Sequence, residues 1–391
     1  MMLLPFLFAA ASAEVSPGRL STSLDGEWQF KLVQPGSAGT QIGTIQVPGS
    51  WEAQGFGNET VEMRTQVLTG VRAATRGAGA LGIYTKKVAL PACDGGSTAV
   101  FMVDQGIHRH AIFKIAGKTV GEHTGYLTPF EHALDHATME DCCCGSSCEI
   151  EVALDGDRPC DKGGCPDALM GAADDDTDGT NLGGWAGLNG HVSVQCRPKV
   201  HIDGGIGNII PPHVTHPPVT TASAGKPLEL TVAFTISGGA ATAHLQILDN
   251  TSGTPVPVAA VSSTAPQTGN ATLMVTIPTV KLWSPEQRAL YTAVVSIGGS
   301  GIAATTVTDS ATTRFGVRTI AVSGHKLLLN GQRVFLAGYG DDSIYPMTVS
   351  PPRDKAVYAA KVQFAHEHGF NFVVSVIRSS SPSLLSFLSV V

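Results

Sequence analysis

The chain has 391 residues, of which 43% are hydrophobic, 15% charged and 6% aromatic. This length suits two or three domains and excludes a single small module. The 25 Lys and Arg residues are outnumbered by 32 Asp and Glu residues, which gives a formal net charge of −7. With no long basic run, the composition argues against a nucleic acid partner. Turn signals at short intervals, with 45 Gly and 23 Pro, predict a mostly β protein.

The N-terminus has features of a secretory signal peptide. Residues 1–10 form an apolar run that is too short to span a bilayer, and the small residues 11–13 follow it. We therefore expect residues 1–13 to be a signal peptide and the mature chain to be secreted or to lie in the lumen of the secretory pathway, without a membrane span. The run lacks a preceding positive charge, so a plain buried N-terminus is the alternative.

Two further features bear on the same compartment. Sequons for N-linked glycans begin at Asn58, Asn250 and Asn270, and they would be usable in a secretory lumen, so we expect a glycoprotein. Six of the eight cysteines crowd into one stretch, and two stand apart from it. The crowded six are Cys142, Cys143, Cys144, Cys148, Cys160 and Cys165, and the separate two are Cys93 and Cys196.

Disulfide bonds are the favoured interpretation of these cysteines, because bonds are stable in an oxidising compartment. Their pairing is not determined by the sequence. The alternative is a zinc site built from the pairs Cys144 with Cys148 and Cys160 with Cys165, but their gaps are wider than the usual two-residue knuckle.

Residues 14–200 are predicted to be short strands broken by Gly and Pro, without a helix of normal length. Alternation is clear at 99–103, 110–116 and 191–195. The stretch 160–184 is rich in Asp, Gly and Cys, which predicts a long surface loop of the kind that often serves a site.

A proline-rich joint at 211–218 precedes a second unit with four alternating apolar segments. These segments are 228–236, 243–247, 273–277 and 291–297. Such short strands within about 100 residues predict a β-sandwich of immunoglobulin-like size.

The pattern changes after residue 318. Asn330-Gly331 between two apolar segments predicts a hairpin with a type I′ turn. A helix is expected from the Pro351-Pro352 pair to Gly369, with Asp354 in a capping or dipole-stabilising role in its first turn. A buried strand at 371–376 would complete a βαβ unit, the building block of a parallel barrel.

Several motifs in this order resemble the family 2 glycoside hydrolases, the group of β-galactosidases, β-glucuronidases and β-mannosidases. The resemblance implies a mostly β chain with a jelly-roll sugar-binding domain at 14–200, an immunoglobulin-like β-sandwich at 201–316 and an incomplete (β/α)8 barrel start at 317–391. The motifs that carry it are Leu24-Asp25-Gly26-Glu27-Trp28-Gln29-Phe30, Val47-Pro48-Gly49-Ser50-Trp51, Gly82-Ile83-Tyr84, Gly183-Gly184-Trp185-Ala186-Gly187-Leu188-Asn189-Gly190, Leu282-Trp283-Ser284-Pro285-Glu286 and Arg314-Phe315-Gly316-Val317-Arg318.

The family hydrolyses O-glycosyl bonds with two glutamates on later barrel strands. Retaining glycosidases need their two carboxyl groups about 5–5.5 Å apart, and a complete barrel needs about 250 residues. Only 75 residues run from Val317 to Val391. We therefore expect this chain to be an inactive N-terminal fragment that lacks the catalytic pair, with no catalytic residue of its own. Truncation of the gene model is the preferred explanation of its Ser- and Leu-rich tail.

A non-catalytic secreted carbohydrate-binding module is the alternative function. In either case the expected partner is a carbohydrate, a β-glycoside, while the particular sugar and the oligomeric state are left open. Asp342 follows the first barrel strand, where barrel sites gather, and is a candidate for sugar contact as much as a turn residue, with Asp341 ranked below it.

The acidic loop supplies the other candidate substrate-binding residues. Asp176 and Asp178 can reach a sugar if the loop extends toward the barrel, as the resemblance implies. Trp185 offers a flat face for stacking, although Trp28 and Trp51 are expected to be structural anchors. No cofactor is expected, with one alternative. Asp174, Asp176 and Asp178 copy the opening of a Ca²⁺ loop, but Trp185 stands where the bidentate Glu belongs.

Overall fold

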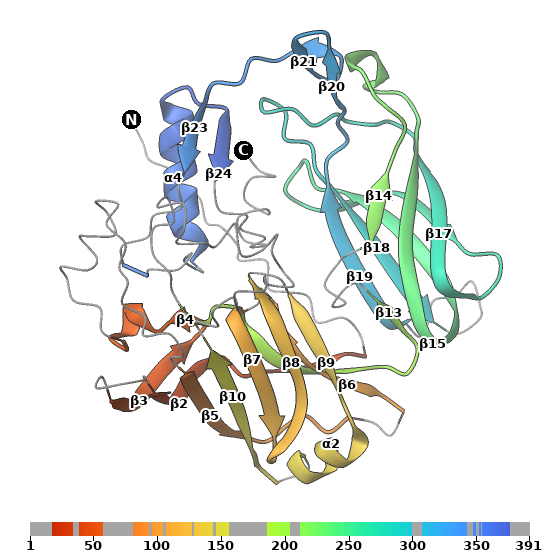
Figure 1. The fold of residues 1–391 in the computed structure, drawn as a ribbon. Helices are drawn as coiled ribbons and strands as arrows, with labels where there is room; N and C mark the ends of the chain where they lie inside the picture. Colours follow the sequence, from red (N-terminus) through yellow and green to blue (C-terminus); the bar gives the residue numbers. More distant parts are fainter. Residues whose placement is uncertain are drawn as a thin grey trace.

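The structure is a computed structural model. It describes residues 18–33, 39–57, 81–93, 96–104, 107–126, 129–143, 146–155, 186–203, 212–298, 307–341, 347–348, 352 and 354–375. Most of these residues lie in strands, so the expected mostly β fold is confirmed (Figure 1).

The first part of the chain folds into two antiparallel sheets. The smaller sheet has the order β1 (Leu20–Ser23), β12 (Val192–Arg197), β6 (Thr98–Val103) and β9 (Phe130–Leu134). The larger sheet has the order β3 (Thr40–Val47), β2 (Gly26–Val33), β5 (Leu81–Val88), β10 (Cys148–Asp155), β7 (Ile107–Ile115), β11 (Gly187–Leu188) and β4 (Gly49–Ser50), with β8 (Lys118–Tyr126) paired to β7.

The core of this first unit lies between the two sheets. Its strands bury every second side chain, as in β2, whose buried positions are Trp28, Phe30 and Leu32. Trp28 donates a hydrogen bond from its indole nitrogen to the backbone oxygen of Leu24 at 2.8 Å. A buried aromatic ring with a satisfied N–H is the expected structural anchor.

A short helix and the pairing of the cysteines in this unit were not predicted by the sequence. A seven-residue helix, α2 (His136–Cys142), begins at Asp135, whose carboxylate accepts a hydrogen bond from the amide of Thr138. A disulfide joins Cys93 to Cys196, the two cysteines that stand apart in the sequence, and a second disulfide joins Cys142 to Cys148.

The second unit is a sandwich built around one long strand. Its strands are β13 (His201–Asp203), β14 (His213–Thr215), β15 (Leu228–Asp249), β16 (Val256–Ser262), β17 (Gln267–Ile277), β18 (Tyr291–Gly298) and β19 (Val307–Phe315), with a 3₁₀ turn, η4 (Thr221–Ser223), before β15. The sequence predicted two strands at 228–236 and 243–247, but the structure has one. Gly238 and Gly239 both have positive φ, and β15 continues through them with a register shift against β17. Most of the β17 ladder lies before these glycines, and the β16 and β18 ladders lie after them.

The third part begins with a hairpin and continues as a parallel unit. The strands β20 (Ile320–Ser323), β21 (Lys326–Leu329) and β22 (Gln332–Arg333) form a small sheet. Asn330 and Gly331 have φ of 52° and 79°, which confirms the predicted turn with two positive φ angles. Next come β23 (Gly338–Asp341), α4 (Lys355–Glu367) and β24 (Phe372–Ser375), and β23 pairs with β24 in parallel.

The helix of this βαβ unit is capped as the sequence predicted. The Asp354 carboxylate accepts a hydrogen bond from the amide of Ala356 at 2.8 Å, and Tyr358, Val362 and Ala365 form the buried face. With seven residues in α2 and thirteen in α4, no helix in the described ranges has the length and hydropathy to cross a membrane.

Candidate functional site

The first unit meets the barrel start on the side where barrel sites form. The hydroxyl of Ser50, in β4, donates a hydrogen bond of 2.8 Å to the backbone oxygen of Thr348. Thr348 lies in the connection that leaves the carboxyl end of β23, and Figure 1 shows β4 below this blue unit. In parallel barrels the loops after the strands carry the active site. The β4 edge therefore reaches this side of the βαβ unit.

A buried polar network holds the β4 edge in place. The carboxylate of Glu52 accepts hydrogen bonds of 3.1 and 3.2 Å from the amide of Ala186, although Glu52 is only 5% exposed. Glu52 belongs to a short 3₁₀ turn, η2 (Glu52–Gln54), directly after Trp51. A buried carboxylate with backbone donors is satisfied, so this contact fixes where the chain returns at residue 186.

Tyr84 completes the network from the neighbouring strand β5. Its hydroxyl accepts hydrogen bonds from the indole nitrogen of Trp51 and from the amide of Leu188. Burial raises the pKa of Tyr84, and the carboxylate of Glu52 acts in the same direction. The Tyr84 hydroxyl is therefore neutral at all physiological pH values, and Trp51 is a buried anchor as predicted.

The network includes Ala186, the first described residue after the acidic stretch that the sequence singled out. Asp155, the last residue of β10, and Ala186 are the described residues on either side of it. The predicted sugar contacts Asp176, Asp178 and Trp185, and the possible Ca²⁺ ligand Asp174, lie outside the described residues. Glu52 and Ser50 were missed as positioning residues, although Ser50 stands within one of the motifs quoted above.

The carboxylates of the barrel start are placed as follows. Asp341 ends β23 directly opposite Ser375 of β24, and Asp342 lies outside the described residues. Glu367 is exposed and accepts a hydrogen bond from Gln363 at 2.9 Å, as expected for a solvated residue. The carboxylate of Asp354 is engaged as the helix cap.

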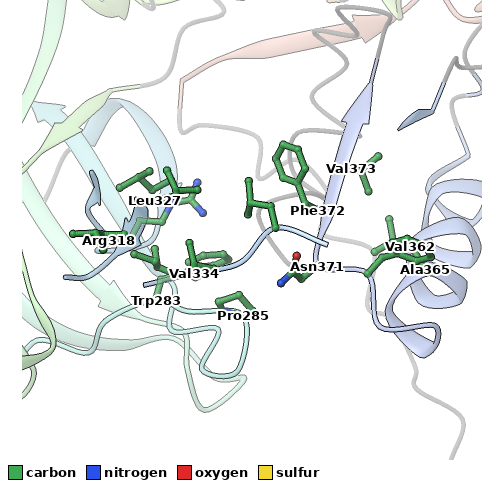
Figure 2. A pocket seen from close by; sticks show the side chains of 15 residues that line it. Trp283, Pro285, Arg318, Leu327, Val334, Val362, Ala365, Asn371, Phe372 and Val373 are labelled. Atoms are coloured by element: carbon green, nitrogen blue, oxygen red, sulfur yellow. The ribbon is translucent and has the colours of Figure 1, made fainter. Parts of the chain in front are cut away.

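The opposite ends of β23 and β24 face an apolar cavity of about 300 Å³. Figure 2 shows Trp283, Leu327 and Val334 on one side of it and Phe372 and Val362 on the other. The cavity thus lies between the hairpin β20–β22 and the amino ends of the barrel strands. In parallel barrels this end contributes to stability and not to catalysis. We call the region around the cavity, between the hairpin with Trp283 and the βαβ unit, the joint.

Polar contacts close the two sides of this joint. On the hairpin side, the buried Asn330 donates a hydrogen bond to the backbone oxygen of Trp283 at 3.0 Å and accepts one from the amide of Thr319 at 2.9 Å. The Arg318 guanidinium lies over the Trp283 ring, 4.4 Å from its centre. On the barrel side, Asn371 accepts a hydrogen bond from the amide of Ala337 at 2.9 Å.

The described residues contain no cluster of three or more His, Cys, Asp or Glu side chains placed to hold a metal ion. Of the cysteines in the predicted zinc pairs, Cys148 is in a disulfide, while Cys144, Cys160 and Cys165 lie outside the described residues. Four of the cysteines thus form disulfide bonds, as predicted. Which cysteine pairs with which is determined by the fold and not by the sequence pattern.

Comparison with known proteins agrees with this architecture. Residues 213–318 match the family model described as "Glycosyl hydrolases family 2". No curated protein matches the chain. A β-glucuronidase from Bifidobacterium dentium is similar in structure, with a TM-score of 0.66, 22% identity and coverage of 91% of this chain and 57% of that one.

Two further solved structures are similar. A glycosyl hydrolase family 2 member from Bacteroides cellulosilyticus has a TM-score of 0.68 and 18% identity, and covers 94% of this chain and 46% of its own. A β-galacturonidase from Eisenbergiella tayi has a TM-score of 0.64 and 16% identity, and covers 96% of this chain and 57% of its own. The chain therefore spans about half the length of these proteins. The resemblance seen in the sequence, to the N-terminal domains and the start of the barrel, is confirmed.

Proposed function

We propose that this chain belongs to a β-galactosidase- or β-glucuronidase-like protein that hydrolyses O-glycosyl bonds. The match of its second unit to the model of glycosyl hydrolases family 2 and its similarity in fold to family 2 structures support the proposal. The observation that carries the proposal is the contact between Ser50 and Thr348. It joins the first unit to the carboxyl side of β23, where a barrel binds its substrate.

In this proposal the first unit contributes to sugar binding and not to bond cleavage. Glu52 holds Ala186, which directly follows Trp185 in the sequence, beside the β4 edge and next to the barrel start. The sugar contacts of this proposal are Asp176, Asp178 and Trp185. Carboxylates accept hydrogen bonds from sugar hydroxyls, and an indole face suits the apolar face of a sugar ring. Asp342 would approach the same sugar from the barrel side.

We further propose that residues 1–391 by themselves do not hydrolyse glycosides. Double-displacement hydrolysis needs an acid and a nucleophile about 5–5.5 Å apart. The described barrel portion is one βαβ unit, in which Asp354 caps a helix and Glu367 lies in solvent. The test is turnover of aryl β-galactosides and β-glucuronides by the purified chain. A rate above that of the matched variant D341N/D342N would contradict this part of the proposal.

Sugar binding is tested separately on the same protein. We expect saturable retention on an immobilised β-galactoside or β-glucuronide, and its loss in D176N/D178N and in W185A. D141N is the matched control, because Asp141 lies in α2 and pairs with Lys118 at the surface. Equal retention of all variants would show that the acidic loop does not contact the sugar. Retention of the purified chain without turnover, together with a transcript that ends at Val391, would favour the carbohydrate-binding module.

The proposed location is the secretory pathway. Residues 1–13, the predicted signal peptide, lie outside the described residues. The disulfide between Cys93 and Cys196 supports the proposal, since such bonds persist in oxidising compartments. Secretion of a reporter fused after residue 13 is the test, and retention of that reporter in the cytosol would contradict it.

A further inference from the structure

We propose that Asn270 is a site of N-linked glycosylation and that Asn250, which also lies in a sequon, is not occupied in the folded protein. The inference rests on the proposed passage into the secretory pathway and goes beyond it, since it selects one acceptor by its surroundings. Asn270 lies in β17, and Asn250 lies at the turn after β15. Both belong to the same β-sandwich, so their surroundings can be compared directly.

Asn270 presents its side chain to solvent from an open strand. In β17 the residues Asn270, Thr272, Met274 and Thr276 are exposed, while the residues between them are buried. The first and third residues of the sequon, Asn270 and Thr272, therefore lie on the same solvent face. Gly269, the residue before the acceptor, is also exposed and has nothing within 4 Å of the position that a Cβ would take.

One hydrogen bond engages the oxygen, and not the nitrogen, of the Asn270 amide. The hydroxyl of Thr235 donates to the Asn270 oxygen at 3.1 Å, which directs the oxygen toward the neighbouring strand β15 and leaves the amide nitrogen on the other side. N-linked glycosylation modifies this nitrogen. The contact with Thr235 can be kept after modification, because it uses only the oxygen.

Asn250 is in the opposite situation. Its amide nitrogen donates a hydrogen bond of 2.7 Å to the hydroxyl of Thr292, and its side-chain oxygen is buried. Its backbone is held in a turn by bonds to Leu290 and Gly253. A glycan on the Asn250 nitrogen would have to break the contact with Thr292 and force the side chain outward. A chain modified there does not reach this fold without local rearrangement.

The covalent step is the ordinary one for a sequon. The Asn270 amide nitrogen forms a bond to the anomeric carbon of a lipid-linked oligosaccharide diphosphate, the co-substrate of the luminal transferase. The bond between that carbon and the diphosphate oxygen breaks, the nitrogen loses one proton, and the lipid diphosphate leaves. No change of oxidation state is involved.

The position also suits a protective glycan. Within the described residues β17 has one ladder partner, β15, so its other edge is open to pairing. Exposed strand edges are usually blocked by charged residues or proline, and β17 contains neither. A glycan at Asn270 would hinder edge-to-edge association at this strand.

The test uses the chain in a eukaryotic cell, with a supplied cleavable leader and the background N58Q, so that passage into the lumen does not depend on the native N-terminus. Secreted protein is treated with peptide N-glycosidase in heavy-oxygen water, which converts a glycosylated Asn into labelled Asp, and peptides are analysed by mass spectrometry. We expect label at position 270 and none at position 250. Label at 250, or an unlabelled 270, would overturn the proposal.

Matched variants separate the sequon from the strand. T272A removes the sequon and is expected to increase mobility on a gel by one glycan, whereas T276A on the same face leaves mobility unchanged. N250Q is likewise expected to have no effect on mobility. Unchanged mobility of T272A relative to T276A would overturn the proposal, while failure of the native leader alone would contradict only the proposed location.

Discussion

The hydroxyl of Ser50 and the backbone oxygen of Thr348 are 2.8 Å apart, although 298 positions separate the two residues in the chain. This hydrogen bond connects an edge strand of the first unit to the loop after the first barrel strand. Loss of this contact is therefore expected when the first unit and the loop after β23 separate.

We expect S50A to loosen this contact. A hydrogen bond of this kind contributes about 0.5–1.5 kcal/mol net, which corresponds to about two- to tenfold faster local opening. Hydrogen–deuterium exchange of the peptide that contains Met347 and Thr348 measures it. S21A is the control, because Ser21 is exposed in β1 of the opposite sheet. Identical exchange in S50A and S21A would show that the contact does not hold the loop.

A second prediction concerns the ion pair that joins the first two units. Arg19 contacts both oxygens of Asp309, at 2.7 and 2.6 Å, and Asp309 also accepts a hydrogen bond from the amide of Ile202. The Asp309 side chain is fully buried and that of Arg19 is 14% exposed. D309A leaves a buried guanidinium without its carboxylate, so we expect a loss of about 3–5 kcal/mol in the free energy of unfolding.

The control for this pair is an exposed one. Lys118 and Asp141 are 3.1 Å apart with side chains 50% and 57% exposed, so K118A is expected to change stability by no more than about 1 kcal/mol. Denaturant unfolding followed by tryptophan fluorescence compares the two variants. A similar small effect of D309A would mean that the joint between the units does not depend on this pair.

The disulfide between Cys93 and Cys196 is expected to stabilise the first unit more than the one between Cys142 and Cys148. The first bond closes a loop with a separation of 103 residues, and the second a loop with a separation of 6. Restricting the unfolded chain stabilises more for a longer loop, so C93S/C196S should cost about 2–5 kcal/mol. Thermal unfolding of both double variants without reductant measures the effect. A larger drop in unfolding midpoint for C142S/C148S than for C93S/C196S would contradict the prediction.

Stability should fall when the pH falls below about 6.5, and His132 should contribute to this. Burial lowers the pKa of His132, and the nearby Glu131 only partly opposes it. The Nε2 atom of His132 is buried without a hydrogen-bond partner among the described residues, and its ring packs near Phe113 and Phe130. The unfolded chain therefore binds this proton at a higher pH than the folded chain, and acid favours unfolding.

The measurement is the unfolding midpoint between pH 7.5 and 5. One proton changes the unfolding equilibrium by at most about tenfold per pH unit, so the slope is limited. H132F should flatten the acid side of the profile, because a phenyl ring cannot be protonated. H136Q is the control, since His136 is 71% exposed and pairs with Glu140 on α2. An unchanged slope in H132F would exclude His132 as the source.

Local patterns in the sequence determined much of this architecture. Alternation along β12 and β18, the Asn330-Gly331 turn and the Asp354 cap each depend on a few consecutive residues, so their outcome was readable from the chain alone. The same holds for the Trp28 anchor, because a large ring in an alternating strand has one face on which to be buried.

Tertiary structure decided what depends on distant neighbours. The pairing of Cys93 with Cys196, the continuity of β15 through Gly238 and Gly239, and the contact of Ser50 with Thr348 each need positions that only the folded chain brings together. The two sequons of the β-sandwich differ in their surroundings for the same reason. Asn250 meets Thr292 from another strand, whereas Asn270 faces solvent. Sequence fixes which groups a residue carries, but burial and partners depend on segments far along the chain, and these decide whether a group is free to react.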